Sequence, residues 1–401
     1  MRINIPAPVN RIIEELNKHG YEAYAVGGCV RDALLNREPD DWDITTSARP
    51  EQVKEIFRRT IDTGIQHGTV TIMMDHVGYE VTTYRIDGSY ADGRHPDSVE
   101  FTSNLLEDLR RRDFTINAMA YSHGTGIVDA YGGVEDLNNK IIRCVGNPME
   151  RFTEDALRIL RAIRFSAQLG FEIEAETQAA ITTIAPNMVH VSKERIQVEL
   201  TKLLKSAHPE RMKLVYETGI SPYLTDNFGK IDPDQIAVSA ELPADKHIRW
   251  AAFLTQLTPE LAAKVLRELK MDNDTISKAK TLVDWMHREL PGNPYELRKA
   301  LCQIGPELWD DLMELKLAEC TDQEDGDRMI RYVWGQEKFI VASGECYNMK
   351  MLAVTGNDVI QAGVKPGKEV GAVLNQLLES VLKNPYNNEK EYLLSCVHKM
   401  I

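Results

Sequence analysis

The chain has 401 residues, of which 43% are hydrophobic and 27% charged, a composition that is typical of globular proteins and excludes a disordered or fibrous chain. Its formal net charge of −14 argues against a general nucleic-acid coat protein. The charge is unevenly distributed, because residues 1–140 and 214–401 each carry −8 whereas residues 141–213 carry +2. Contacts with a polyanion are therefore expected near the middle segment.

Two features of the sequence concern its location in the cell. No apolar run approaches the roughly 20 residues that a membrane helix needs, and residues 1–6 lack the apolar core of a secretion signal. The six cysteines form no C-x-x-C pair, which disfavours a structural zinc site or a disulfide framework. We therefore expect a cytoplasmic protein that makes no contact with a membrane.

The first 140 residues mix helix and strand signals. Residues 8–19 predict an amphipathic helix, residues 21–26 a strand that runs into two glycines, and residues 29–35 a second helix. Further strand signals, rich in β-branched residues, occur at Ile44 and in residues 70–72, 79–83 and 99–101. We expect a twisted sheet with helices packed on it.

From about residue 150 onward, strand signals almost disappear. Segments with a period of 3.6 residues predict helices at 153–168, 174–184, 192–206, 208–218, 259–270, 275–288, 295–303, 307–319 and 369–383. Breaks at residues 226–234, 291–294 and 321–327 predict joints between them. The second half is therefore expected to be mostly α-helical.

A glycine pair followed by two aspartates forms the first chemical motif. Gly27-Gly28 lies between a predicted strand and a predicted helix, where backbone N–H groups can hold a phosphate and Arg31 can add positive charge. Asp41 and Asp43 follow, and residues i and i+2 of a strand point to the same face. Two such carboxylates repel each other unless a hard cation such as Mg²⁺ lies between them. A polar loop would explain D-x-D alone, but the preceding glycines favour a metal and phosphate site.

Glu80 offers a third carboxylate in the alternating segment 79–83, where it is either a catalytic group beside the aspartates or a charge on an edge strand. A basic run at residues 110–112 is followed by Asp113 and Asn117. As a bare run it favours a solvated surface. With the acid and the amide it offers guanidinium donors and an acceptor that suit a ribose hydroxyl or a triphosphate.

Residues 154–165 predict an amphipathic helix that carries Asp155 and the arginines Arg158, Arg161 and Arg164 on one face. One interpretation is an ordinary helix with salt bridges between successive turns. The other is base recognition, because an aspartate accepts and an arginine donates hydrogen bonds. Cytosine and adenine both present an amino donor beside a ring-nitrogen acceptor, whereas uracil and guanine present the reverse. A rigid Asp155–Arg158 pair would accept C and A and reject U and G.

These motifs, in this order, resemble those of the class II tRNA nucleotidyltransferases, specifically the CCA-adding enzymes of the bacterial type. The resemblance covers residues 20–205, including Tyr131-Gly132-Gly133 and residues 192–200, and extends more loosely to residues 355–388. It implies an α+β protein that begins with a nucleotidyltransferase α/β head of the polymerase-beta-like type. All-α parts would follow: the head at 1–140, a base-recognising neck at 141–206, a body at 207–305 and a tRNA-binding tail at 306–401.

The resemblance also implies an activity, namely template-independent addition of CCA to the 3′ end of tRNA from CTP and ATP, with Mg²⁺ and release of pyrophosphate. Asp41 and Asp43 would ligate Mg²⁺, with Glu80 as a third catalytic group. Gly28 and Arg31 would contact the triphosphate, whereas Arg112, Asp113 and Asn117 would handle ribose and phosphates. Asp155 and Arg158 would read the base, supported by Arg161 and Arg164.

Several alternatives stay open at this point. Bacterial poly(A) polymerases carry a basic, aromatic strand where this chain has His67-Gly68-Thr69-Val70, and CC-adding enzymes lack a flexible loop like that of residues 85–94. An A-adding enzyme, an inactive RNA-binding module and a transferase with a protein or small-molecule acceptor are further alternatives. The paired aspartates disfavour the inactive module, and the long helical half favours an RNA acceptor. The sequence leaves open whether the protein is a homodimer.

Overall fold

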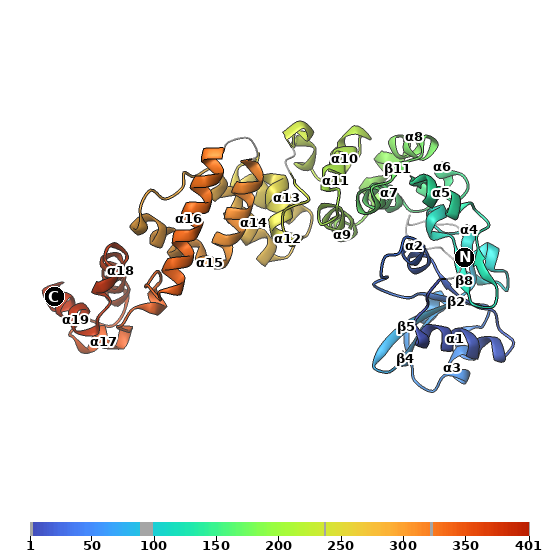
Figure 1. The fold of residues 1–401 in the computed structure, drawn as a ribbon, viewed down its shortest axis with the longest axis horizontal. Coiled ribbons are helices and arrows are strands. Elements are labelled where there is room, and N and C mark those ends of the chain that lie inside the picture. The colour runs from blue at the N-terminus through green and yellow to red at the C-terminus, as the bar shows by residue number, and fades with distance from the viewer. Residues whose placement is uncertain (1–2, 89–98, 236–237, 321–323, 401) are drawn as a thin grey trace. The chain divides into compact units, whose positions relative to one another are not determined.

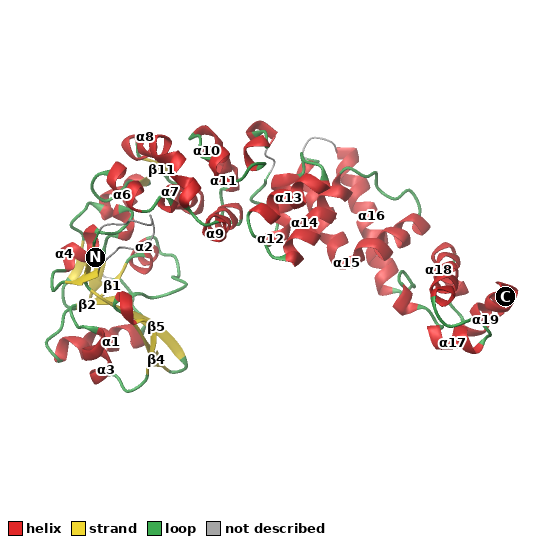
Figure 2. Ribbon diagram, turned by 180° about the vertical axis from the view of Figure 1, so that it is seen from behind, coloured by secondary structure: helices red, strands yellow, loops and turns green. Residues whose placement is uncertain are grey.

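The structure is a computed structural model that describes residues 3–88, 99–235, 238–320 and 324–400. The chain divides into two compact units, one of Met1–Gln235 with Glu268–Met271 and one of Ile236–Arg267 with Asp272–Ile401. All of the described strands belong to the first unit, and the second is built from helices (Figure 2). The predicted α+β class with a helical second half is confirmed.

A mixed sheet of seven strands forms the N-terminal part of the first unit (Figure 1). In sheet order the strands are β3 (Thr60–Gly64), β4 (Thr69–Met74), β5 (Val77–Thr83), β2 (Ile44–Thr46), β1 (Ala23–Val26), β8 (Ala120–Ser122) and β9 (Gly126–Val128). Neighbours are antiparallel except for β2 and β5, which run parallel with Ile44 opposite Val81. This register places the residue before β2, Asp43, beside Glu80.

The two faces of the sheet differ in what covers them. Val70, Ile72 and Val81 are fully buried on one face, and α1 (Ala7–Lys18) and α3 (Pro50–Ile56) pack against the sheet. Because side chains alternate along a strand, Glu80 points to the face opposite Val81. The polar face of β2 and β5 is thus left for the candidate site.

Two small strand pairs complete the described β-structure, β6 (Arg85–Asp87) with β7 (Val99–Phe101) and β10 (Ile141–Ile142) with β11 (Glu172–Ile173). Of the flexible loop predicted at residues 85–94, Arg85–Asp87 form β6, and residues 89–94 lie outside the described residues.

Short helices follow the sheet along the rest of the first unit. They are α2 (Gly28–Leu34), α4 (Leu105–Arg110), α5 (Gly133–Asn139), α6 (Pro148–Glu154), α7 (Leu157–Leu169), α8 (Ala175–Ile184), α9 (Lys193–Leu204), α10 (Lys213–Glu217) and α11 (Ser221–Leu224). Turns of 3-10 helix lie at Ile65–His67, Thr115–Asn117, Ala185–His190, Pro209–Met212, Phe228–Lys230 and Pro233–Gln235. The boundary between the two units directly follows the joint predicted at 226–234.

The prediction of one continuous helix over residues 153–168 is wrong. α6 ends at Glu154, and α7 begins only at Leu157. Asp155 between them has an extended backbone, with φ −145° and ψ 102°. Its carboxylate accepts a hydrogen bond from the N–H of Leu157 at 3.1 Å. Because such a local bond satisfies an N–H group that a helix leaves unpaired at its start, it favours a new helix start over continuation.

The second unit contains α12 (Lys246–Leu254), α13 (Pro259–Glu268), α14 (Asn273–Met286), α15 (Pro294–Glu319), α16 (Glu324–Ala342), α17 (Gly356–Gln361), α18 (Lys368–Lys383) and α19 (Lys390–Met400), with 3-10 turns at Met349–Met351 and Pro385–Asn387. α15 is kinked at Gly305, which has φ 77° and ψ 162° and precedes Pro306, so the two separate helices predicted there are its two arms. None of the described helices is long and apolar enough to cross a membrane.

Four helices of this unit escaped the sequence analysis, namely α12, α16, α17 and α19. α12 is buried along its length from Ile248 to Leu254, including the charged residue Arg249. α16 contains two glycines and begins inside the predicted joint 321–327. Glycine lowers intrinsic helix propensity, and here tertiary packing outweighs it.

Candidate active site

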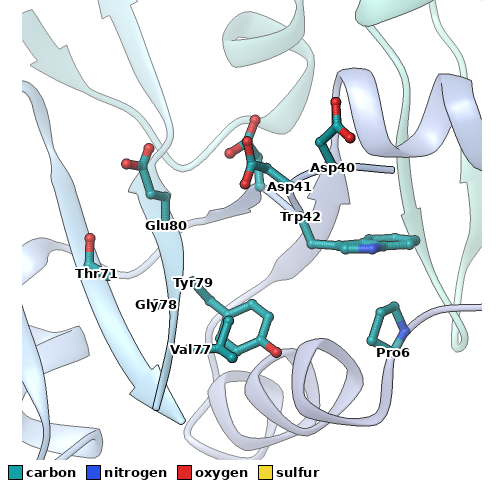
Figure 3. A pocket seen from close by; sticks show the side chains of 10 residues that line it. Pro6, Asp40, Asp41, Trp42, Thr71, Val77, Gly78, Tyr79 and Glu80 are labelled. Carbon is teal, nitrogen blue, oxygen red and sulfur yellow. The ribbon is translucent and has the colours of Figure 1, made fainter. Parts of the chain in front are cut away.

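Asp41 and Asp43, the predicted Mg²⁺ ligands, line a cavity of about 450 Å³ in the first unit. Figure 3 shows this cavity. Its lining residues are Pro6, Asp40, Asp41, Trp42, Asp43, Thr71, Val77, Gly78, Tyr79 and Glu80. Asp41 and Glu80 extend toward the same space, whereas Trp42 points the other way, toward Pro6 (Figure 3). We call this cavity the acidic pocket.

Two of the predicted carboxylates, Asp41 and Glu80, act on the third, Asp43. The pKa of Asp43 is raised, mainly because the surrounding protein removes water from the carboxylate, and further by the negative charges of Glu80 and Asp41. Arg112 opposes this rise. β5 lies between β4 and β2, but its pairing with β2 begins at Val81, so Glu80 lies where β5 pairs with β4 alone.

The acidic pocket suits a cation that is completed by the substrate. No three His, Cys, Asp or Glu side chains in the described part of the chain come together as a metal-binding group. Mg²⁺ is commonly held by one or two carboxylates together with substrate phosphates and water. The crowding of negative charge that raises the pKa of Asp43 is what such a cation would relieve. Asp41 and Asp43 thus fit Mg²⁺ as a pair rather than as a closed cage.

A second cavity, of about 220 Å³, lies directly beside the first and shares Asp43 and Glu80 with it. We call it the basic pocket, because its lining includes three arginines. Its lining residues are Val26, Asp43, Ile44, Thr69, Glu80, Thr82, Arg85, Arg111 and Arg112. The shared carboxylates therefore stand between a negatively charged space and a space lined by guanidinium groups.

Two of these arginines are oriented by Asp108 on α4, a residue that the sequence analysis missed. Its Oδ1 accepts from Arg111 Nη2 at 2.8 Å, and Arg112 Nη2 lies 3.5 Å from its Oδ2. Burial alone would raise the pKa of Asp108, but the two guanidinium groups lower it overall. Its signal in the sequence is its position three and four residues before the arginines, one helical turn away.

The predicted glycine turn is formed by backbone conformation and close packing. Gly27 has φ 84°, a region that favours glycine, and Arg112 Nη1 lies 2.9 Å from where a β-carbon would stand. Gly28 begins α2. The predicted phosphate ligand Arg31 is buried, donates to Asn117 Oδ1 at 2.7 Å and forms a two-point pair with Asp32. Arg31 thus links the turn to Asn117.

Asp113, the predicted ribose ligand, is already saturated with hydrogen bonds. Its Oδ1 accepts from the N–H of Phe114 at 2.8 Å and from Asn117 Nδ2 at 3.1 Å, and its Oδ2 accepts from Arg161 at 2.8 and 2.5 Å. Burial would raise the pKa of Asp113, but Arg161 and Asn117 lower it well below its usual range. In this conformation, Asp113 joins the head to α7.

Three of the predicted arginines converge on one ring that sequence analysis did not single out. The guanidinium carbons of Arg31, Arg161 and Arg164 lie 5.0, 5.4 and 3.9 Å from the ring centre of Phe165. Burial lowers the pKa of Arg164 to about 10, although Glu199 on α9, 2.7 Å from Arg164 Nε, opposes that shift. The pattern shows Phe165 only as a core residue, because its contact with Arg31 spans 134 positions.

The predicted Asp155–Arg158 pair does not form a unit on one helix face. Asp155 Oδ2 accepts from Arg195 Nη2 at 2.7 Å, whereas Arg158 Nη1 donates to Glu154 at 2.8 Å. Arg158 also donates to the carbonyl oxygens of Arg151 and Arg111. The expected geometry is wrong because α6 ends before Asp155, so the two residues are not separated by one regular turn. The alternative of a salt bridge with Glu154 is present for Arg158.

Three segments of the chain match known protein families. Residues 23–143 match the family described as "Poly A polymerase head domain", and residues 170–228 match "Probable RNA and SrmB- binding site of polymerase A". Residues 243–397 match tRNA nucleotidyltransferase domain 2. The candidate site lies largely within the first of these regions, with α7 and α9 contributing from the residues that follow it.

The chain is similar over its whole length to curated proteins named CCA-adding enzyme. It is 38% identical to those of Levilactobacillus brevis, over 96% of both chains, and Lacticaseibacillus paracasei, over 100% of this chain and 99% of the relative. Among solved structures, the Bacillus stearothermophilus CCA-adding enzyme in complex with CTP is 34% identical, with a TM-score of 0.83 over 99% and 98% of the two chains. The Thermotoga maritima CCA-adding enzyme complexed with tRNA-CCA shares the fold, at 20% identity and a TM-score of 0.61.

Proposed function

The chain belongs to the CCA-adding enzymes, a family of tRNA nucleotidyltransferases, and from this we propose that it completes the 3′ end of tRNA by adding C, C and A from CTP and ATP. The observation that supports this reaction most directly is the pair of adjoining pockets that share Asp43 and Glu80. A carboxylate pair beside a cluster of arginines suits the transfer of a nucleotidyl group from a triphosphate.

We assign the triphosphate to the basic pocket. Arg111 and Arg112 are held in place by Asp108, so their positive charge is oriented before the substrate arrives. Mg²⁺ bound by Asp41 and Asp43 would neutralise charge on the phosphates and make the acceptor hydroxyl more acidic. Glu80 adds a third negative charge at the boundary of the two pockets, where it can orient the acceptor hydroxyl.

We assign base selection to Asp155 and Arg158, with a structural consequence. Both side chains have protein partners, Arg195 and Glu154, and both keep free hydrogen-bonding capacity, because a carboxylate has about four acceptor sites and a guanidinium five N–H donors. The energy of exchanging one charge-assisted hydrogen bond for another is small when the new partner is well placed. Arg161 and Arg164, fixed by Asp113 and Glu199, would support this segment without touching the base.

We propose a division of the chain into a head (1–140), a neck (141–206), a body (207–305) and a tRNA-binding tail (306–401). The end of the head-domain match at residue 143 supports the first joint. The match over residues 170–228 spans the proposed joint between neck and body, and the boundary between the compact units falls within the proposed body. We further propose a cytoplasmic reaction, since both tRNA and nucleoside triphosphates are available there.

The experiment that tests this function uses tRNA lacking its 3′ CCA. The protein is supplied with CTP alone, ATP alone and both together, with Mg²⁺, and the product ends are sequenced. We expect two C residues with CTP, and complete CCA only with both nucleotides. Runs of A from ATP alone would identify a poly(A) polymerase instead, and products that end at CC with both nucleotides would identify a CC-adding enzyme.

A further inference from the structure

One half of the acidic pocket is not acidic. Pro6, Trp42, Val77 and Tyr79 line the side away from Asp41 and Glu80, and the side chains of Trp42 and Tyr79 lie on that side (Figure 3). Val77 is 51% exposed although it is apolar, whereas Trp42 and Tyr79 are half-buried. An open apolar and aromatic surface that adjoins catalytic carboxylates is a feature of ligand sites.

We infer that this surface, which we call the aromatic shelf, holds the terminal base of the RNA acceptor by stacking, and so positions the acceptor's 3′-hydroxyl at Asp41, Asp43 and Glu80. This inference rests on the proposed function and adds to it the subsite of the second substrate. The shelf consists of Pro6, Trp42, Val77 and Tyr79.

Charge decides which substrate each pocket can take. Among the described residues that line the acidic pocket, four are carboxylates and none is a lysine or arginine. A triphosphate would be repelled there, whereas the basic pocket offers Arg85, Arg111 and Arg112. In an in-line displacement the attacking oxygen and the leaving pyrophosphate lie on opposite sides of the phosphorus. With the pyrophosphate on the arginine side of Asp43 and Glu80, the attacking hydroxyl comes from the acidic pocket. The shelf belongs to this pocket, although Val77 and Tyr79 alternate with Glu80 along β5 and point to the other face of the sheet.

The chemistry of the shelf also matches an acceptor whose last base changes. During CCA addition the terminal base is first that of the shortened tRNA, then the first C and then the second C. A site that reads hydrogen bonds would favour one of these bases. Stacking on an aromatic surface tolerates all of them, because every base has a π-face.

The shelf is built on rigid elements. Pro6 precedes α1, and its carbonyl accepts the N–H of Asn10 at 3.1 Å. Tyr79 lies in β5 opposite Ile72 of β4, in a hairpin closed by a two-residue turn, Asp75-His76, with positive φ at both positions. A surface held by a helix start and a tight hairpin does not need to be ordered when the base arrives, which favours binding.

A double change in enzyme and acceptor tests the inference. We compare wild type with Trp42→Ala on two acceptors, tRNA ending in a normal nucleotide and the same tRNA ending in an abasic nucleotide that keeps its 3′-hydroxyl. The measured quantity is kcat/KM for adding the next C. We expect Trp42→Ala to lower it roughly tenfold to a hundredfold on the normal acceptor, the range of base stacking. On the abasic acceptor, which is already poor for wild type, the substitution should cost less than about twofold.

The contrary result is an equal loss on both acceptors, which would mean that Trp42 only shapes the neighbouring aspartates and would overturn the inference. Tyr79→Ala and Val77→Ala repeat the comparison in case Trp42→Ala folds poorly, and Trp42→Phe should recover most of the activity. Ile61→Ala on β3 is the matched control for Val77→Ala, because both side chains are apolar and about half exposed. It should leave kcat/KM unchanged on both acceptors.

A second readout separates the shelf from the nucleotide pocket. The affinity for CTP, measured with Mg²⁺ in the absence of acceptor, should stay within about twofold of wild type in Trp42→Ala. A loss of CTP affinity as large as the loss in kcat/KM would place the incoming nucleotide, not the acceptor, on the shelf. If wild type adds no nucleotide to either acceptor, the proposed function itself fails, a result distinct from additive losses.

Discussion

Two groups of carboxylates in the first unit have opposite environments. Asp41 and Asp43 stand beside Glu80, and mutual repulsion adds to the loss of water to raise the pKa of Asp43. Asp113, by contrast, accepts four hydrogen bonds, and arginine holds its pKa well below its usual range. Carboxylates that repel one another favour the binding of a ligand such as a cation. Carboxylates whose oxygens already accept hydrogen bonds from protein donors stabilise the fold.

Sequence motifs alone do not distinguish carboxylates that bind a ligand from carboxylates that stabilise the fold. Asp41, Asp43 and Asp113 all lie in motifs that resemble the CCA-adding enzymes, and all were expected to touch substrate or metal. Only the first two remain open to the acidic pocket. The comparison therefore predicts that substitutions of the first group remove activity and spare stability, and that substitution of Asp113 does the reverse.

The largest expected effect follows from removing either member of the metal pair. Asp41→Ala and Asp43→Ala should lower the rate of both C and A addition by about a thousandfold or more, because each removes one of the two carboxylates assigned to Mg²⁺. Initial rates with saturating Mg²⁺ measure this effect, and gel shifts should show largely intact tRNA binding. Either variant keeping a tenth of wild-type turnover would show that the metal assignment is wrong.

The next largest effect concerns stability and Asp113. Asp113→Ala leaves Arg161, whose side chain is one-third exposed and also faces Glu199, without its main partner, and we expect a loss of about 1–3 kcal/mol of folding free energy. Urea unfolding should show this loss as a lower midpoint. Asp108→Ala, which removes a carboxylate partner of Arg111 and Arg112, serves as the matched comparison. A fully stable Asp113→Ala with relaxed preference for CTP over dCTP would restore the original ribose assignment.

The fold was predictable where local pattern and packing agree. The helices near residues 8–19, 259–270 and 369–383 follow from amphipathic spacing that matches their buried faces. α12 was missed, although its residues from Ile248 to Leu254 are all buried. The break at Asp155 was missed because a single side-chain hydrogen bond, to the N–H of Leu157, decides it, and a periodic pattern averages over such bonds.

The site was predictable as a set of residues but not as a set of roles. Motif spacing identified Asp43 and Arg112, which the structure brings to one pocket. It could not show that Asp108 orients Arg112, nor that Phe165 receives three arginines, because these contacts depend on how separate segments fold together. Sequence reports which groups are present, whereas the partner of each group is a tertiary property.

A smaller effect is expected for base choice. Arg158→Ala should lower the C over U and A over G preferences by roughly tenfold to a hundredfold, the scale of one lost charge-assisted hydrogen bond. Single-nucleotide incorporation of the four triphosphates measures these ratios. Glu154→Gln is the matched control, because it weakens the salt bridge with Arg158 without removing the guanidinium. Unchanged ratios together with a lower melting temperature would show that Arg158 is only structural.

The smallest effect is a gain in stability with a definite pH dependence. Because the folded protein raises the pKa of Asp43 above its unfolded value, ionisation of this carboxylate disfavours the folded state. Wild type should therefore lose stability as pH rises through the range between the unfolded and folded pKa values. Asp43→Asn removes that penalty, so in metal-free buffer it should unfold at a slightly higher temperature than wild type at pH 7. The difference should vanish below the unfolded pKa, where Asp43 is protonated in both states.

Asp113, whose folded pKa is lowered, stabilises the protein above its unfolded pKa and loses that contribution as pH falls, so Asp113→Asn should be less stable than wild type at pH 7. If both asparagine variants destabilised the protein equally at pH 7, the contrast between the two groups would not hold.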